Sequence, residues 1–242
     1  MIVPALCGEA SSPRWRSLRE RIARGARRAC VALLAVAGAH AAAAGDAGAP
    51  LKFEKAFSDT AEPASAHFKA TFVSKGSSHQ MEVWRDGQHR LKRRTDGAIE
   101  TFVVRKPASA EFRMIILDTP HKIVTRIDRS NLYRVGNFTD WFDLAHGIRH
   151  PKGEYQLARA VAPAGVPRPL STCAWYDLTQ AQHVVHVCWS TRSRLPMLLV
   201  DERGTVVWQL TQLDHHAIPA ATFQVHDEGF VQNDANADMD RD

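Results

Sequence analysis

The sequence predicts a mainly β (α+β) protein, built as a single antiparallel, unclosed half-barrel of about ten strands with one or two short covering helices. Three observations lead to this fold class. Apolar and polar residues alternate with a period of two over much of residues 65–226, as in strands with one buried face. Turn dipeptides such as Asp86-Gly87 and Asp96-Gly97 separate these stretches. No strand-helix-strand period occurs, and twist curls such a meander into a barrel or half-barrel.

The first 44 residues have the composition of a secretory signal peptide. Seven arginines precede the apolar run 29–39, which ends in small residues. That run is about 11 residues long, whereas a membrane-spanning helix needs about 20. We therefore expect export to the periplasm, cleavage near Ala41 or Ala44, and no permanent membrane anchor.

Removing this leader changes the charge of the protein. The leader holds seven arginines and two glutamates, which leaves 24 of the 31 basic and 24 of the 26 acidic side chains in residues 45–242. A neutral mature chain gives no support to a nucleic-acid partner. The charges are uneven: residues 85–134 hold twelve basic and six acidic side chains, and residues 201–242 hold two and nine.

The elements before residue 128 follow in order. In the N-terminal segment 45–64, Phe53 and Phe57 at i, i+4 predict a short amphipathic helix. The first strand, 67–73, places Phe68, Ala70 and Phe72 on one face. Further strands are expected at 80–84, with Met81 and Val83 on one face, and at 88–94, 99–105, 112–117 and 122–127.

Residues 128–150 interrupt the strand pattern, because their apolar residues recur at spacings of three and four. We expect a short helix at 139–147, capped by Asn137 or Thr139 and stopped by Gly147. Strands resume at 154–160, 173–179, 182–189, 196–200, 205–212 and 222–225. Residues 65–226 form the half-barrel domain, and residues 227–242 an acidic, disordered tail.

Two cysteines, Cys173 and Cys188, remain after the leader is removed. If strands 173–179 and 182–189 pair about a tight turn at Gln180-Ala181, the two cysteines lie directly opposite each other. Opposed residues in such a ladder are close enough for a disulfide. We predict a structural disulfide, which agrees with an oxidising compartment.

The sequence contains little that points to catalysis or metal binding. His146 and His150 stand at i, i+4, but Gly147 and Pro151 predict that the helix ends before His150. Gly-x-Ser-x-Gly, Ser-x-x-Lys and Cys-x-x-Cys motifs are absent. We expect no enzymatic activity, no metal and no cofactor.

The concave face of a half-barrel provides a cup for an acyl chain or another apolar ligand. We expect the cup and its lid to be lined by alternating strand residues and by the helical segment: Phe68, Phe72, Met81, Val83, Phe102, Met114, Ile116, Phe138, Trp141, Phe142 and Leu144. The same residues are equally able to close a solid core with no cavity, and the pattern does not say which sheet face is concave.

The segment 173–213 resembles the core of the LolA/LolB-like superfamily. The resemblance lies in Cys-Ala-Trp-Tyr at 173–176 and in the run from Val187 through the Leu195-Pro196 turn to Leu210. It implies an unclosed antiparallel half-barrel covered by helices that binds acyl chains without catalysis. The superfamily includes lipoprotein carriers, outer-membrane receptors and the lipid-binding domain of the RseB/MucB sensors.

Two functions follow as hypotheses. The first is a soluble, monomeric periplasmic binder of lipid or lipoprotein acyl chains, acting as an accessory carrier, chaperone or sensor with at most peripheral membrane contact. The second is a protein-interaction or regulatory sensor module that binds an envelope protein through its charged surfaces, namely the basic stretch 85–134 and the acidic C-terminal end.

Overall fold

The computed structural model describes residues 51–106, 109–134 and 140–235, all within the compact unit Pro50–Asp242. The expected signal peptide, its cleavage site and the start of the N-terminal segment lie outside the described residues. None of the helices in the described ranges is both long and apolar enough to cross a membrane.

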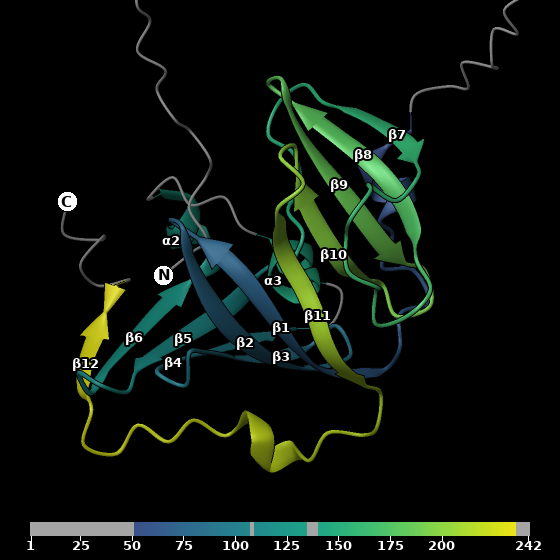
Figure 1. The fold of residues 1–242 in the computed structure, drawn as a ribbon. Helices are drawn as coiled ribbons and strands as arrows, with labels where there is room; N and C mark the ends of the chain where they lie inside the picture. The colour runs from purple at the N-terminus through teal and green to yellow at the C-terminus, as the bar shows by residue number, and fades with distance from the viewer. Residues whose placement is uncertain (1–50, 107–108, 135–139, 236–242) are drawn as a thin grey trace, which may run out of the picture. The chain divides into compact units, whose positions relative to one another are not determined.

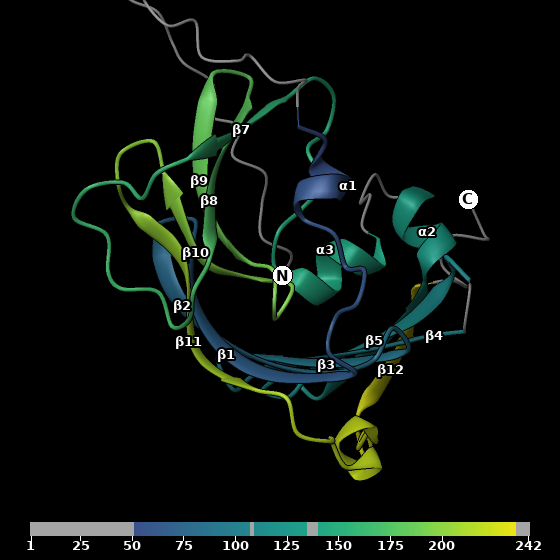
Figure 2. The same cartoon turned by 90° about the vertical axis from the view of Figure 1, so that its right-hand side faces the viewer.

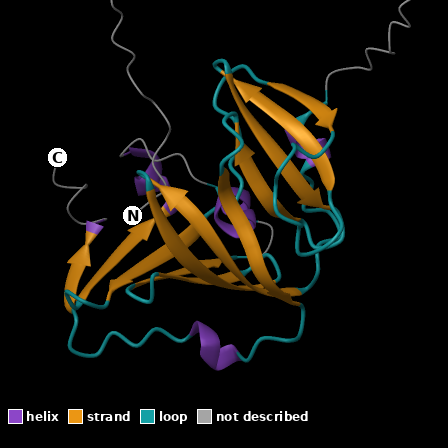
Figure 3. Ribbon diagram, viewed as in Figure 1, coloured by secondary structure: helices purple, strands orange, loops and turns teal. Residues whose placement is uncertain are grey.

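The described residues form one twelve-stranded sheet, unclosed at both edges, with few helical residues (Figures 1 and 3). Its strand order is β12-β6-β5-β4-β3-β2-β1-β11-β10-β9-β8-β7. The strands are β1 (Ser65–Ser74), β2 (Ser77–Asp86), β3 (Arg90–Thr95), β4 (Ile99–Arg105), β5 (Phe112–Asp118), β6 (Ile123–Asp128), β7 (Gln156–Ala160), β8 (Ala174–Gln180), β9 (His183–Ser190), β10 (Leu195–Asp201), β11 (Val206–Asp214) and β12 (Val231–Asp234). The predicted mainly β, unclosed fold is confirmed.

The sheet curls around the helices α1 (Phe53–Ala56), α2 (Arg129–Arg134) and α3 (Trp141–His146), which lie on its concave side (Figure 2). The segment between β11 and β12, with the short 3-10 helix η1 (Ala220–Phe223), lies on the convex side. The helix expected from Phe53 and Phe57 is therefore present, and the two short helices α2 and α3 occupy the interruption at 128–150.

The C-terminal part differs from the expectation in two places. Residues 222–225, expected as a strand, begin inside η1, because Pro219 accepts a hydrogen bond from Thr222 N (3.0 Å) and starts a tight turn. Residues 231–234, expected in the tail, form β12 instead. β12 pairs with β6 in parallel, because the chain crosses the convex face before it reaches that edge.

The helix α3 begins at Trp141, two residues later than the expected start at 139, and its cap is Asp140. The Asp140 side chain accepts a hydrogen bond from Asp143 N (2.9 Å), which satisfies an otherwise free N–H of the first turn. Asn137 and Thr139 lie outside the described residues. Gly147 ends the helix as predicted, with a φ of 69°, and a Cβ there would lie 2.8 Å from the Trp208 ring.

The hairpin of β8 and β9 forms, but the predicted register is wrong. The turn residues are Ala181 and Gln182, both with positive φ, so that Cys188 lies opposite Trp175. Cys173 precedes β8 and is diagonal to Cys188. Cys173 itself is not paired in the ladder. Its Cα nevertheless lies 5.4 Å from that of Cys188, within the range for a disulfide, and the predicted disulfide is present.

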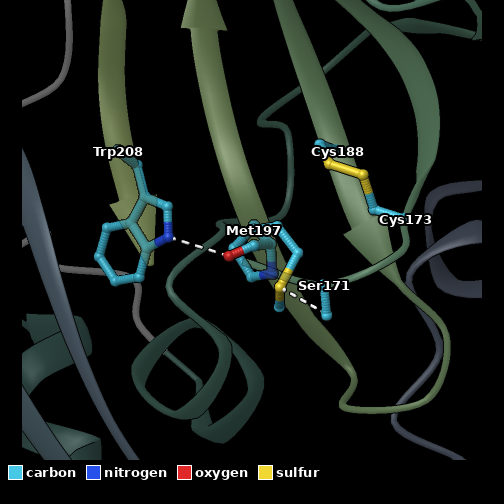
Figure 4. The surroundings of a disulfide bond; sticks show 6 residues. Ser171, Cys173, Cys188, Met197 and Trp208 are labelled. Carbon is cyan, nitrogen blue, oxygen red and sulfur yellow. Dashed lines mark hydrogen bonds between the residues drawn. A yellow bond between two sulfur atoms is a disulfide. The ribbon is translucent and has the colours of Figure 1, made fainter. Parts of the chain in front are cut away.

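The disulfide fixes the end of the loop that joins β7 to β8, in addition to the hairpin (Figure 4). In this loop Ser171 Oγ donates to Met197 Sδ (3.1 Å). Trp208 Nε1 donates to the Pro196 carbonyl (3.1 Å) on the neighbouring strand β10. The loop is thereby held against the buried side of β10.

Candidate ligand-binding site

The concave face carries a continuous apolar surface. Phe68 pairs with Val83 across β1 and β2, and Ala70 pairs with Met81 in the same ladder. Phe68 and Val83 are each 1% exposed, and Met81 and Met114 are nearly as buried. Six of the seven expected strand residues belong to this one cluster: Phe68, Phe72, Met81, Val83, Met114 and Ile116.

Phe102 is the exception, because the structure places it on the convex face. It packs there with Leu117 and Val124, under Val225 and Phe230 of the crossing segment. Strand β4 has apolar side chains on both faces, with Val103 buried on the concave side. Alternation in the sequence was therefore unable to assign Phe102 to a face.

The expected lid residues are divided between two clusters. Trp141 is buried in the same cluster as Phe68, and Leu144 packs against it. Phe142 packs instead in a second cluster, with its ring centroid 5.9 Å from that of Phe53 in α1. Phe138 lies outside the described residues. The helix α3 thus spans the boundary between the concave face and the packing of α1.

A buried polar cluster of Glu62, Arg85 and His146 fastens the C-terminal end of α3 to the sheet. Arg85 Nη1 lies 3.1 Å from Glu62 Oε2 and donates to the Ala145 carbonyl (3.3 Å). His146 Nε2 lies 2.9 Å from the same Glu62 oxygen. The Arg85 and His146 side chains are fully buried, so α3 is joined to β2 through groups that solvent does not reach.

A further contact orients the His146 ring in this Glu62 cluster. His146 Nδ1 lies 3.0 Å from the Phe142 carbonyl, which only accepts, so Nδ1 carries a proton. Burial lowers the pKa of Arg85, and the charges of Glu62 and Asp59 oppose that effect.

Sequence reasoning missed Glu62 and Arg85 as parts of the site. The sequence did contain a signal for Arg85. Side chains alternate between the two faces of a strand, so Arg85 lies on the same face as Met81 and Val83. An arginine on an otherwise apolar face predicts a buried partner. Glu62 gave no such signal, since it lies in an irregular segment between α1 and β1.

A second polar group lies at the other end of α3. Asp140, Asp143 and His150 place one ligand atom each within 4.8 Å of one another, which suits a cation in principle. These carboxylates have structural partners, however: Asp143 Oδ1 accepts from His150 N (3.0 Å) and faces its Nδ1 (3.0 Å). We assign the group to capping of α3 rather than to metal binding.

This arrangement raises the pKa of His150 above its usual value of 6.5. The hydrogen bond with Asp143 is the main cause, and the charges of Asp140, Asp143 and Glu54 add to it against the effect of burial. The protonated form of His150 is therefore stabilised at the start of α3.

No family model matches this chain, and no curated protein matches it. Among solved structures it is similar to a crystal structure of MucB, with 16% identity, a TM-score of 0.35 and coverage of 71% of this chain and 61% of that chain. It is also similar to a crystal structure of MucB in complex with MucA(peri), with 16% identity, a TM-score of 0.33 and coverage of 69% and 55%.

The chain thus spans less than two thirds of the length of either MucB chain. The resemblance expected from the sequence includes the RseB/MucB sensors, and both matched structures contain MucB.

Proposed function

We propose that this protein is a non-enzymatic, soluble periplasmic protein that binds lipid or lipoprotein acyl chains on the concave face of its sheet, as an accessory carrier or sensor. One observation carries the proposal: a continuous apolar face of an unclosed sheet is covered by a helix of only six residues. A sensor role would add an envelope protein as partner.

In this proposal an acyl chain takes the place of this cover on the concave face. A six-residue helix is too short to be stable by itself, so α3 stays folded through its contacts with the sheet. Burial of an acyl chain gains about 0.8 kcal/mol per methylene, or about 8 kcal/mol for ten. In exchange, α3 would give up the contacts of Trp141 and Leu144 with the cluster and its attachment through Glu62. In this proposal α3 is the lid.

The charged-surface hypothesis has less support. Seven of the twelve basic side chains in the stretch 85–134 lie in ion pairs with acidic side chains, which reduces the free positive charge available to a partner: Arg85, Arg90, Lys92, Arg94, Arg113, Arg126 and Arg129. We therefore do not offer it as a second function.

The test compares a charge on the concave face with the same charge on the convex face. Met114→Glu changes the buried cluster, whereas Val104→Glu changes a convex-face residue of β4 that is 52% exposed. With a fluorescent fatty acid, we expect binding to the wild type and V104E, and at least tenfold weaker binding to M114E.

Native mass spectrometry of the protein purified from its own periplasm is the companion measurement. We expect a bound lipid that M114E lacks. A wild-type protein that is empty and also binds no fatty acid would contradict the proposal, and would mean that the concave cluster is a solid core.

A further inference from the structure

Arg93 lies in the middle of the concave face. It pairs with Val83 of β2 on one side and with Thr101 of β4 on the other, and both of these face the concave side. This row of paired residues, which runs across the strands, continues to Phe68 in β1 and to Ile116 in β5. Its guanidinium is therefore placed among the residues that the proposed acyl chain would contact.

Part of the Arg93 guanidinium has no partner among the described residues. Its Nε is buried and has no hydrogen-bond partner, although the residue as a whole keeps some accessible surface. Within the described ranges, no carboxylate forms an ion pair with Arg93 or with Arg149. Burial, together with the like charge of the nearby Arg149, lowers the pKa of Arg93 to about 10.

The other arginines near this face are compensated. Arg85 pairs with Glu62, and Arg105 donates to the Gln88 carbonyl (2.5 Å) while its guanidinium lies 4.7 Å from the Trp141 ring centroid. A half-buried guanidinium that is affected by the charge of the exposed Arg149, and that has no carboxylate partner among the described residues, is unfavourable in the free protein. An anion placed between Arg93 and Arg149 would remove that cost.

We propose that Arg93 and Arg149 bind the anionic headgroup of the ligand whose acyl chain lies on the concave face. This inference rests on the proposed function and names the ligand class: an amphiphile with a carboxylate or phosphate head. A guanidinium binds both groups through paired N–H donors. The acyl chain would run from Arg93 along its row, towards Val83 and Phe68.

The experiment uses three probes that share one oleoyl chain and differ in the head: oleate, 1-oleoyl-lysophosphatidate and the uncharged monooleoylglycerol. Each is titrated into the wild type, Arg93→Gln, Arg149→Gln and the control Arg113→Gln. Arg113 is a suitable control, because it lies on β5, in the same sheet but two strands from Arg93, and its side chain is 88% exposed beside Asp128.

We expect R93Q to weaken binding of one or both anionic probes at least tenfold and R149Q to weaken it about threefold, as expected for loss of a charge-assisted hydrogen bond. The affinity for monooleoylglycerol should change less than twofold in every variant, and R113Q should bind all three probes as the wild type does. The anionic probe with the larger change identifies the head as a carboxylate or a phosphate.

If the arginine variants lose affinity equally for charged and uncharged probes, or lose none, the headgroup site is overturned and the proposed function still stands. Failure of the wild type to bind any of the three probes would overturn both. Arg93→Lys keeps the charge but loses the paired donors, so an intermediate loss of about threefold is expected. If R93Q does not fold, the Arg93→Lys and Arg149→Gln variants keep the test decisive.

Discussion

Glu62 lies against two fully buried side chains, so its removal has a different cost from removal of a surface carboxylate. In Glu62→Ala, Arg85 would stay buried without its counter-ion, and α3 would lose its attachment through His146. We expect the free energy of unfolding in urea to fall by about 3–5 kcal/mol.

Glu111→Ala is the control, because Glu111 pairs with Arg129 but is 61% exposed. Its loss should cost less than about 1 kcal/mol. Equal effects of the two substitutions would show that the Glu62 cluster does not hold α3.

His150 gives the stability of α3 a dependence on pH. Its folded pKa is raised, so its contribution is fully present below pH 6.5 and is lost as the pH rises through the folded value. We expect His150→Gln to lower the free energy of unfolding by about 0.5–1 kcal/mol at pH 5.5, and by less at pH 8.5. His183→Gln, at an exposed pair with Glu202, should show a smaller change. An effect of H150Q that is the same at both pH values would contradict the assignment.

At the scale of single residues, the sequence predicted apolar positions better than polar ones. Phe68, Met81 and Val83 follow strict alternation, and the structure places all three on the concave face. Arg85 and Glu62 meet only through the irregular segment between α1 and β1, and no periodicity describes such a segment.

The hairpin of β8 and β9 shows what sequence can and cannot establish about an element. The strands and the disulfide were predicted, whereas the turn lies one residue later, at Ala181 and Gln182. Both residues adopt positive φ without glycine, and two-residue turns of this kind are normally recognised by Asn-Gly or Asp-Gly. The turn therefore carried no sequence signal that fixed its register.

The disulfide should stabilise the folded protein by about 3 kcal/mol, since it closes a loop of 15 residues. We expect Cys173→Ser to lower the free energy of unfolding by about that amount. Dithiothreitol should destabilise the wild type to the same extent and leave the variant unchanged. Limited proteolysis of C173S should cleave first between β7 and β8, where the loop loses its anchor.

Wild-type stability that does not respond to the reductant would contradict a structural role for this bond. Free thiols at Cys173 and Cys188 in protein taken from the periplasm would also contradict it.

At the scale of the whole described unit, local turn signals predicted the meander β1 to β6 and the strands β7 to β11. They did not predict that the chain would cross the convex face after β11 and add β12 to β6. This crossing depends on Phe102, Leu117 and Val124, which form an apolar patch on the convex side that Val225 and Phe230 cover. Contacts so distant in sequence leave no periodic pattern.

The position of β1 in the sheet has a consequence for folding. β1 lies between β2 and β11, so that His67, near the start of the described residues, pairs with Asp214, which is distant in sequence. Such a pairing has a high contact order and a large loop-closure cost. Strands β1 to β6 can assemble early, but the concave face remains open until residues 206–214 arrive. Until residues 206–214 are synthesised, the sheet is therefore incomplete and β1 is an unpaired edge beside exposed apolar surface, which is a state prone to aggregation.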